Sequence, residues 1–88
     1  MEPGSHWRNL FENWPGSVPQ AGIVIGVGEQ IPFKSFMIGD GMLLLERERP
    51  DPSGARKIII AFDQIQAVKT IDTLDMARYQ AFGFAPTA

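Results

Sequence analysis

The fold of this chain is decided by residues 58–68, whose sequence is IIIAFDQIQAV. The apolar residues at the start of this segment favour a buried β-strand. Asp63 and Gln64 interrupt the strand, and Ile65 and Val68 follow at a spacing of three residues, which predicts one short helical turn. Small five-stranded barrels join their last two strands through such a turn, so the segment predicts an architecture of this kind.

Length and composition limit what such a fold can do. The chain has 88 residues, a net charge of -2 and no cysteine. A chain this short buries only about 60–65% of its unfolded surface, so oligomerisation would help its thin core. Absence of cysteine removes disulfides and thiolate metal sites and makes a cytoplasmic location the default expectation. The acidic balance argues against a surface that attracts phosphate throughout, although a local basic patch remains open.

No membrane partner is expected from the sequence. Residues 1–7 lack both the basic segment and the apolar run of a signal peptide. No later run approaches the roughly 20 apolar residues that a membrane-spanning helix requires.

Two helices are predicted at the ends of the chain. Ser5 is expected to cap the first, over about residues 5–14, whose apolar stripe has helical spacing: Trp7, Leu10, Phe11 and Trp14. We interpret both tryptophans as cover for an open end of the barrel rather than as a ligand-stacking site. Asp72 or Thr73 is expected to cap the second helix, over about residues 73–82, which ends at Gly83. Because this helix is apolar over a wide arc, contact with another subunit is also expected.

Between the helices, the alternation of apolar residues predicts five strands within residues 20–71: 22–28, 31–38, 42–45, 58–62 and 69–71. Residues 39–41 are expected to form a tight turn and residues 50–54 a hairpin loop. Strand 42–45 is apolar on both faces, so something outside the barrel is expected to cover it. The predicted architecture is a single, mainly β domain over residues 1–88: a small, strongly bent, SH3-like barrel with a helix at each end.

Two segments carry a resemblance to a known family. Residues 38–43 read IGDGML, and residues 59–65 read IIAFDQI and are followed by Val68. Over about residues 20–71, the order of elements and these two segments resemble the Sm-like family of small barrels, which includes the Sm, LSm and bacterial Hfq proteins. The resemblance implies a five-stranded bent barrel and a homo-oligomeric ring of about five to seven subunits built by edge-strand pairing.

The departures from the family pattern concern its RNA-binding pore. In the family, an Asn of the first motif and an Arg of the second hold a uracil base, whereas this chain has Leu43 and Ala61 at those places. Family-type oligo-uridine binding at the pore is therefore not carried over. In the ring that the resemblance implies, strand 58–62 would pair with strand 42–45 of the next subunit. A monomeric SH3-like barrel with the same turn is the alternative.

No enzyme, cofactor or metal is expected. The carboxylates of Glu29, Asp40, Asp63 and Asp72 fall on separate turns, and the only histidine, His6, starts the first helix. The glycines of residues 26–31 do not form a dinucleotide-binding motif, because the third glycine is missing and no βαβ unit follows.

Two functions remain from the sequence. The first is a ring that binds single-stranded RNA through a surface other than the family's pore, with these candidate contacts: Lys34, Asp40, Arg56, Lys57, Phe62, Asp63, Gln64 and Lys69. The second is a protein assembly or scaffold module without nucleic-acid binding. The candidate residues for contact between subunits are the same in both: Met42, Leu43, Leu44, Leu45, Ile58, Ile59 and Ile60.

Overall fold

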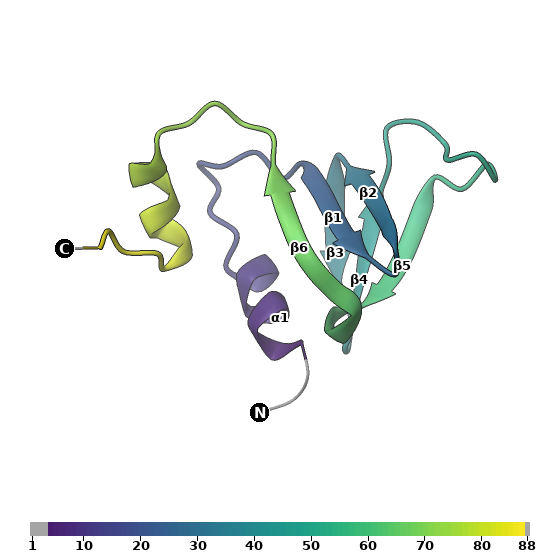
Figure 1. Ribbon diagram of the computed structural model, residues 1–88, viewed down its shortest axis with the longest axis horizontal. Coiled ribbons are helices and arrows are strands. Elements are labelled where there is room, and N and C mark those ends of the chain that lie inside the picture. Colours follow the sequence, from purple (N-terminus) through teal and green to yellow (C-terminus); the bar gives the residue numbers. More distant parts are fainter. Residues whose placement is uncertain (1–3, 88) are drawn as a thin grey trace.

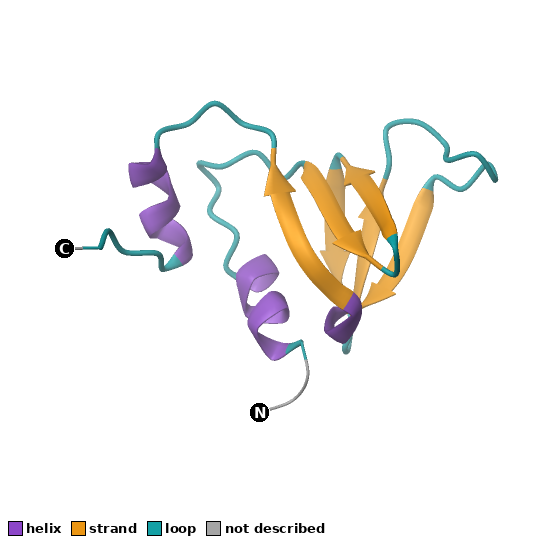
Figure 2. Cartoon of the chain, in the orientation of Figure 1, coloured by secondary structure: helices purple, strands orange, loops and turns teal. Residues whose placement is uncertain are grey.

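The computed structural model describes residues 4–87 and is mainly β, with six strands in two antiparallel sheets (Figures 1 and 2). The first sheet has the order β2-β1-β6 and consists of β1 (Gly22–Gly26), β2 (Glu29–Phe33) and β6 (Ile65–Thr70). The second has the order β3-β4-β5 and consists of β3 (Ser35–Ile38), β4 (Met42–Glu46) and β5 (Lys57–Ala61). The predicted β class is confirmed, but the described residues form six strands rather than five and no closed barrel.

The sixth strand arises because the predicted strand 31–38 breaks at Lys34. The Lys34 backbone N–H donates to the carbonyl of Glu46 at 2.8 Å, so the chain turns from the first sheet into the second at this residue. Phe33 is buried, whereas Met37, which regular alternation along one strand would place on the same face, is exposed. The bend interrupts the alternation of side chains, so Phe36, beyond the bend, packs against the same core as Phe33.

The helical turn in the decisive segment is confirmed. Residues Phe62–Gln64 form a 3-10 helix, η1, that leads from β5 directly into β6. Gly26 permits this crossing, because a Cβ at that position would lie 2.4 Å from the carbonyl oxygen of Gln64. The two sheets are therefore connected twice, at Lys34 and at η1.

The first hairpin is tighter than expected. β1 ends at Gly26 rather than at residue 28, because Val27 and Gly28 form the turn with φ values of 47° and 76°. In the hairpin of β4 and β5, Glu46 lies opposite Lys57 and their side chains pair at 3.8 Å. Opposite charges thus lie across from each other on these two strands.

The two terminal helices differ in detail from the prediction. α1 (Ser5–Glu12) has Gly4 at its N-cap with φ 79°, so Ser5 is inside the helix and is not its cap. At the other end, η2 (Met76–Phe82) is a 3-10 helix that starts later than predicted. Its end at Gly83, where φ is 103°, agrees with the expectation. The Asp72 carboxylate accepts a hydrogen bond from the N–H of Leu74 at 3.0 Å. This bond stabilises the connection before η2 and does not cap the first turn of η2.

The core lies between the sheets and α1. Its buried side chains include four aromatic ones, whose rings contact one another: Phe11, Trp14, Phe33 and Phe62. The indole N–H of Trp14 donates to the carbonyl of Val18 at 3.2 Å, so this buried polar atom is satisfied. Trp14 is thus a core residue, whereas Trp7 is only partly buried.

Candidate functional site

The two segments that resemble the Sm-like motifs meet at one end of the molecule. The backbone N–H of Phe62, at the start of η1, donates to the carbonyl of Gly41 at 3.1 Å. The turn of residues 39–41 is closed by a bond from the Gly39 N–H to the carbonyl of Met42 at 2.8 Å. Gly4 fits closely against η1, where a Cβ would lie 2.5 Å from the backbone nitrogen of Asp63. The two segments are therefore held together by backbone hydrogen bonds of the turns and by the close approach of the start of α1.

Three of the predicted RNA contacts are exposed at this end, and one is not. Asp40, Asp63 and Gln64 are exposed, and Asp40 lies 3.8 Å from the guanidinium of Arg8. Phe62, in contrast, is only 2% exposed and belongs to the core. As a candidate RNA contact it is therefore not accessible in this structure, because its ring packs against Phe11 rather than facing solvent.

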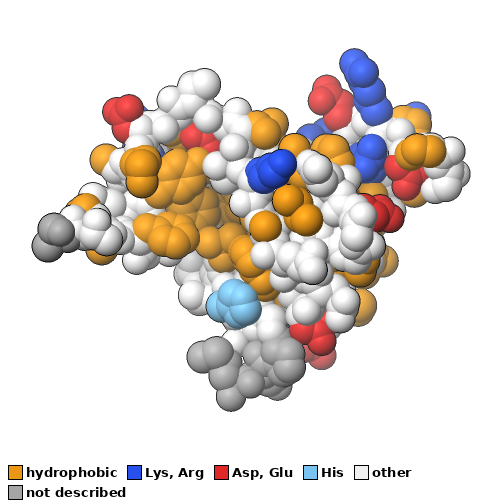
Figure 3. Space-filling model, viewed as in Figure 1, with side chains coloured by type: hydrophobic (Ala, Val, Ile, Leu, Met, Phe, Trp, Pro, Cys, Tyr) orange, Lys and Arg blue, Asp and Glu red, His pale blue; other side chains and the backbone are white. Residues whose placement is uncertain are grey.

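The predicted basic contacts do not gather with those residues. Lys34 and Lys57 both act on Glu46, whose pKa is lowered chiefly by the hydrogen bond from Ser35 and further by these two cations. Lys69 lies across the first sheet, where its ammonium contacts the amide oxygen of Gln30 at 3.4 Å. Arg56 stands in the hairpin loop, where Lys, Arg and acidic side chains are interspersed (Figure 3). The cations are thus spread over several elements and several have a polar or acidic neighbour.

The predicted interface residues divide into buried and exposed ones. Leu43, Leu45 and Ile60 point into the core, so their side chains are not available to another subunit. β4 is the central strand of its sheet, with β3 on one edge and β5 on the other. The expected pairing of strand 42–45 with a neighbouring chain is therefore wrong, because both of its edges are used within the chain.

β5, by comparison, has one edge without a partner strand among residues 4–87. Next to this edge, an apolar row crosses the outer face of the second sheet through directly paired residues, Met37, Leu44 and Ile59. Ile59 is 66% exposed and Met37 69% exposed. A polar row, Ser35, Glu46 and Lys57, borders it on one side. We call Met37, Leu44 and Ile59 the outer apolar row.

A third site was missed by the sequence reasoning. An apolar cavity of about 230 Å³ lies between α1, β6 and η2, where Figure 3 shows a hollow of hydrophobic side chains. At one wall, the Tyr79 hydroxyl contacts both the carboxylate of Asp72 and the hydroxyl of Thr70. Tyr79 lies seven residues beyond Asp72, and only the fold of the connection brings them together. The sequence offered one signal for this contact: a polar residue, Asp72, after a predicted strand and a tyrosine further along the chain. This signal is weak.

Neither the family models, the curated proteins nor the solved structures contain a significant match to this chain. The Sm-like resemblance therefore rests on the two quoted segments and on the order of the elements. Within residues 4–87, no group of three or more His, Cys, Asp or Glu side chains is placed to hold a metal ion. None of the described helices has the length and apolar character needed to cross a membrane.

Proposed function

We propose that this protein is a self-assembling module of the Sm-like kind, whose copies join through the free edge of β5. In this proposal the two sheets are the halves of a strongly bent, SH3-like barrel. β2 and β3 would be one bent strand of that barrel, since only Lys34 separates them. β5 and β6 would be its last two strands, separated only by η1.

The observation that carries the proposal is the unprotected state of the β5 edge. Natural proteins block exposed edges with proline, charge or a covering element. β2 contains Pro32, which removes an N–H from that edge strand, and α1 lies against β3. Residues 58–61 of β5 have neither charge nor proline, and the exposed Ile59 lies in the same strand. Such an edge is suited to pair with another strand.

β6 of a second copy is the partner that we propose for this edge. β6 is an edge strand of the first sheet and has no strand on its other side among the described residues. A contact from β5 of one copy to β6 of the next joins two different surfaces, so each added copy offers the same free strand again. Such a contact closes into a ring when the rotation permits, and we propose about five to seven subunits from the Sm-like resemblance.

The mass of the protein in solution tests this proposal. Light scattering on the eluting protein is expected to give about five to seven times the chain mass of 9.7 kDa. Ile59→Lys, which places a charge beside the proposed contact, is expected to give a smaller species. Ile71→Lys is the matched control, because Ile71 is 65% exposed and lies outside both strands. A wild-type peak at the mass of one chain would contradict the proposal.

Binding of single-stranded RNA is the second candidate. In its favour, the two loops that correspond to the family's motifs are joined by the bond between Phe62 and Gly41. Against it, Asp40 and Asp63 lie exposed at that end, and a phosphate would meet their charge. Titration with labelled oligo-U, oligo-A and single-stranded DNA at two salt concentrations separates the candidates. Binding that weakens steeply with salt would support RNA binding, and its absence at low salt would leave the scaffold function.

A further inference from the structure

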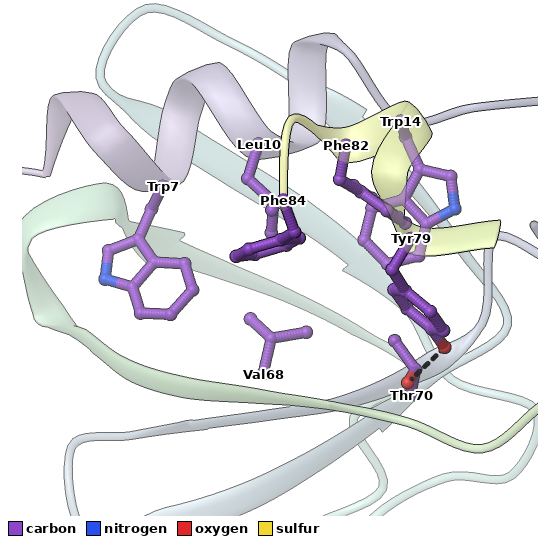
Figure 4. A pocket seen from close by; sticks show the side chains of 8 residues that line it. All are labelled: Trp7, Leu10, Trp14, Val68, Thr70, Tyr79, Phe82 and Phe84. Carbon is purple, nitrogen blue, oxygen red and sulfur yellow. Dashed lines mark hydrogen bonds between the residues drawn. The ribbon is translucent and has the colours of Figure 1, made fainter. Parts of the chain in front are cut away.

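The cavity between α1, β6 and η2 has the walls of a site for an aromatic ring. Aromatic side chains from the N-terminal and C-terminal parts of the chain surround it: Trp7, Trp14, Phe82 and Phe84 (Figure 4). Val68 from β6 lies opposite them. Trp14 and Phe82 are already in edge-to-face contact, with ring centroids 5.1 Å apart. A ring entering this space would meet the faces and edges of other rings, which is a favourable arrangement.

The size of the cavity agrees with a small molecule. Its volume is about 230 Å³. An engineered apolar cavity of about 150 Å³ is known to stay dry and to bind benzene. The present cavity therefore has room for a substituted benzene or a fused two-ring compound. The space is also open on one side, so a ligand would enter without a rearrangement of the sheets.

One wall of the cavity provides a hydrogen-bond acceptor of fixed orientation. The Tyr79 hydroxyl donates its proton to Asp72, a bond that also lowers the pKa of this carboxyl. Since that proton is used, the Thr70 hydroxyl must donate to the Tyr79 oxygen in their 2.7 Å contact. The lone pairs of the Thr70 oxygen remain to accept a hydrogen bond from another molecule. Figure 4 shows both hydroxyls at the edge of the aromatic walls.

We propose that this cavity is a binding site for a small aromatic molecule that carries one hydrogen-bond donor, such as a phenol or an indole. The ring occupies the space between the tryptophan and phenylalanine side chains. The O–H or N–H of the ligand donates to the Thr70 oxygen. The cavity is lined by Val68 and Thr70 of β6, the strand that the proposed assembly would pair with β5 of another copy. The inference itself rests on the lining of the cavity and not on the assembly.

The test compares three ligands that differ in one property each. Backbone amide NMR spectra of the full chain are recorded during titration with p-cresol, 4-methylanisole and hexanol. p-Cresol is expected to cause saturable shifts at residues that line the cavity. 4-Methylanisole, which has the ring without the donor, is expected to bind about threefold to tenfold more weakly. Hexanol, which has the donor without the ring, is expected to bind more weakly than p-cresol.

Two variants test the residues of the cavity, and a third is the control. Thr70→Val removes the acceptor at nearly constant volume, so the preference for p-cresol over 4-methylanisole is expected to disappear while ring binding remains. Thr73→Val, at an exposed position outside the cavity, is the control and is expected to keep the preference. Val68→Phe is expected to fill the cavity and to abolish the shifts with both ring compounds.

Several results would overturn the inference. These are the absence of saturable shifts with p-cresol, shifts that map away from the cavity, or binding of p-cresol that survives Val68→Phe in a folded protein. Hexanol binding as tightly as p-cresol would show an aliphatic site instead. A preference for p-cresol that persists in Thr70→Val would refute the proposed hydrogen bond.

Discussion

Val27 has a backbone conformation that is unfavourable for its side chain. Its φ of 47° lies in the left-handed region, which is costly for a β-branched residue. Gly28 follows with φ 76°, so the two residues have the positive φ values of a two-residue hairpin turn. Asn-Gly is the sequence that this kind of turn prefers.

Val27→Asn is therefore expected to stabilise the protein by about 1 kcal/mol, because asparagine tolerates this conformation better than valine. Little burial is lost, since Val27 is an exposed residue. Urea unfolding measures the difference. Val27→Ile, which keeps the β-branch, is the control and should bring no gain. Equal stability of the asparagine and isoleucine variants would show that the backbone conformation of residue 27 has no energetic weight.

Asp51 is a residue whose charge organises a loop. One oxygen of its carboxylate accepts hydrogen bonds from the Ser53 N–H at 2.9 Å, the Ser53 hydroxyl at 2.7 Å and the Ala55 N–H at 2.8 Å. These bonds, with the one from the Ser53 hydroxyl the largest, hold the pKa of Asp51 below its ordinary value. A carboxyl whose pKa is lower in the folded state adds stability above its unfolded pKa and loses it as the pH falls through the folded pKa.

Asp51→Asn keeps an acceptor oxygen but removes the charge. We expect the variant to be less stable than wild type near neutral pH. The difference should shrink as the pH falls from about 6 to about 2.5, because the wild-type carboxyl then becomes protonated. Urea unfolding at four or five pH values measures it. A difference that stays constant over this range would contradict the assignment of the effect to ionisation.

Among the elements, η2 depends on few contacts. None of its residues is buried, and Phe82 gives it a ring contact with the core residue Trp14. The bonds among Thr70, Asp72 and Tyr79 tie it to the end of β6. An element held in this way is expected to open locally without unfolding of the sheets.

Phe82→Ala is expected to weaken the docking of η2 by about 1–2 kcal/mol, since it removes a half-buried aromatic ring. Hydrogen exchange should then become faster at residues 76–83 and stay unchanged in β1 and β4. Met76→Ala, at a position that is 88% exposed in the same element, is the control and should leave exchange unchanged. Uniformly faster exchange over the whole chain would show that η2 and the sheets unfold together.

At the scale of the whole molecule, the proposed assembly predicts a stability that depends on protein concentration. Association stabilises the folded chain by mass action, so the unfolding temperature should rise over a hundredfold increase in concentration. Ile59→Lys should reduce this dependence, and Ile71→Lys should preserve it. Calorimetry at several concentrations makes the measurement. An unfolding temperature that is independent of concentration for the wild type would indicate a monomer.

The sequence predicted the β class, the terminal helices and η1, because each has a local signal in the alternation of residues or in a turn. It did not predict the break at Lys34, since the residues on both sides of it still favour a strand and the bend depends on the contact with Glu46. The 3-10 form of η2 was missed for a similar reason, because its apolar pattern suits an α-helix equally well.

The candidate sites were predicted less well than the fold. Residue type alone suggested that Phe62 was available to a base, but its burial depends on the position of Phe11 in α1. The sequence reasoning paired strand 58–62 with strand 42–45 of another subunit, whereas the use of both edges of β4 within the chain followed only from the completed sheet order. The hydroxyl pair of Thr70 and Tyr79 arises from a connection whose path no local pattern specifies.

Because the chain passes between the two sheets twice, at Lys34 and at η1, it could be divided into two peptides that both contribute to each sheet. The loop at residues 50–54 separates β1 to β4 from β5 and β6, yet β5 pairs with β4 in one sheet and β6 pairs with β1 in the other. Two peptides cut between Pro52 and Ser53 would each contribute strands to both sheets. We expect them to recognise each other and to refold as a complex, which would make this small protein a split reporter.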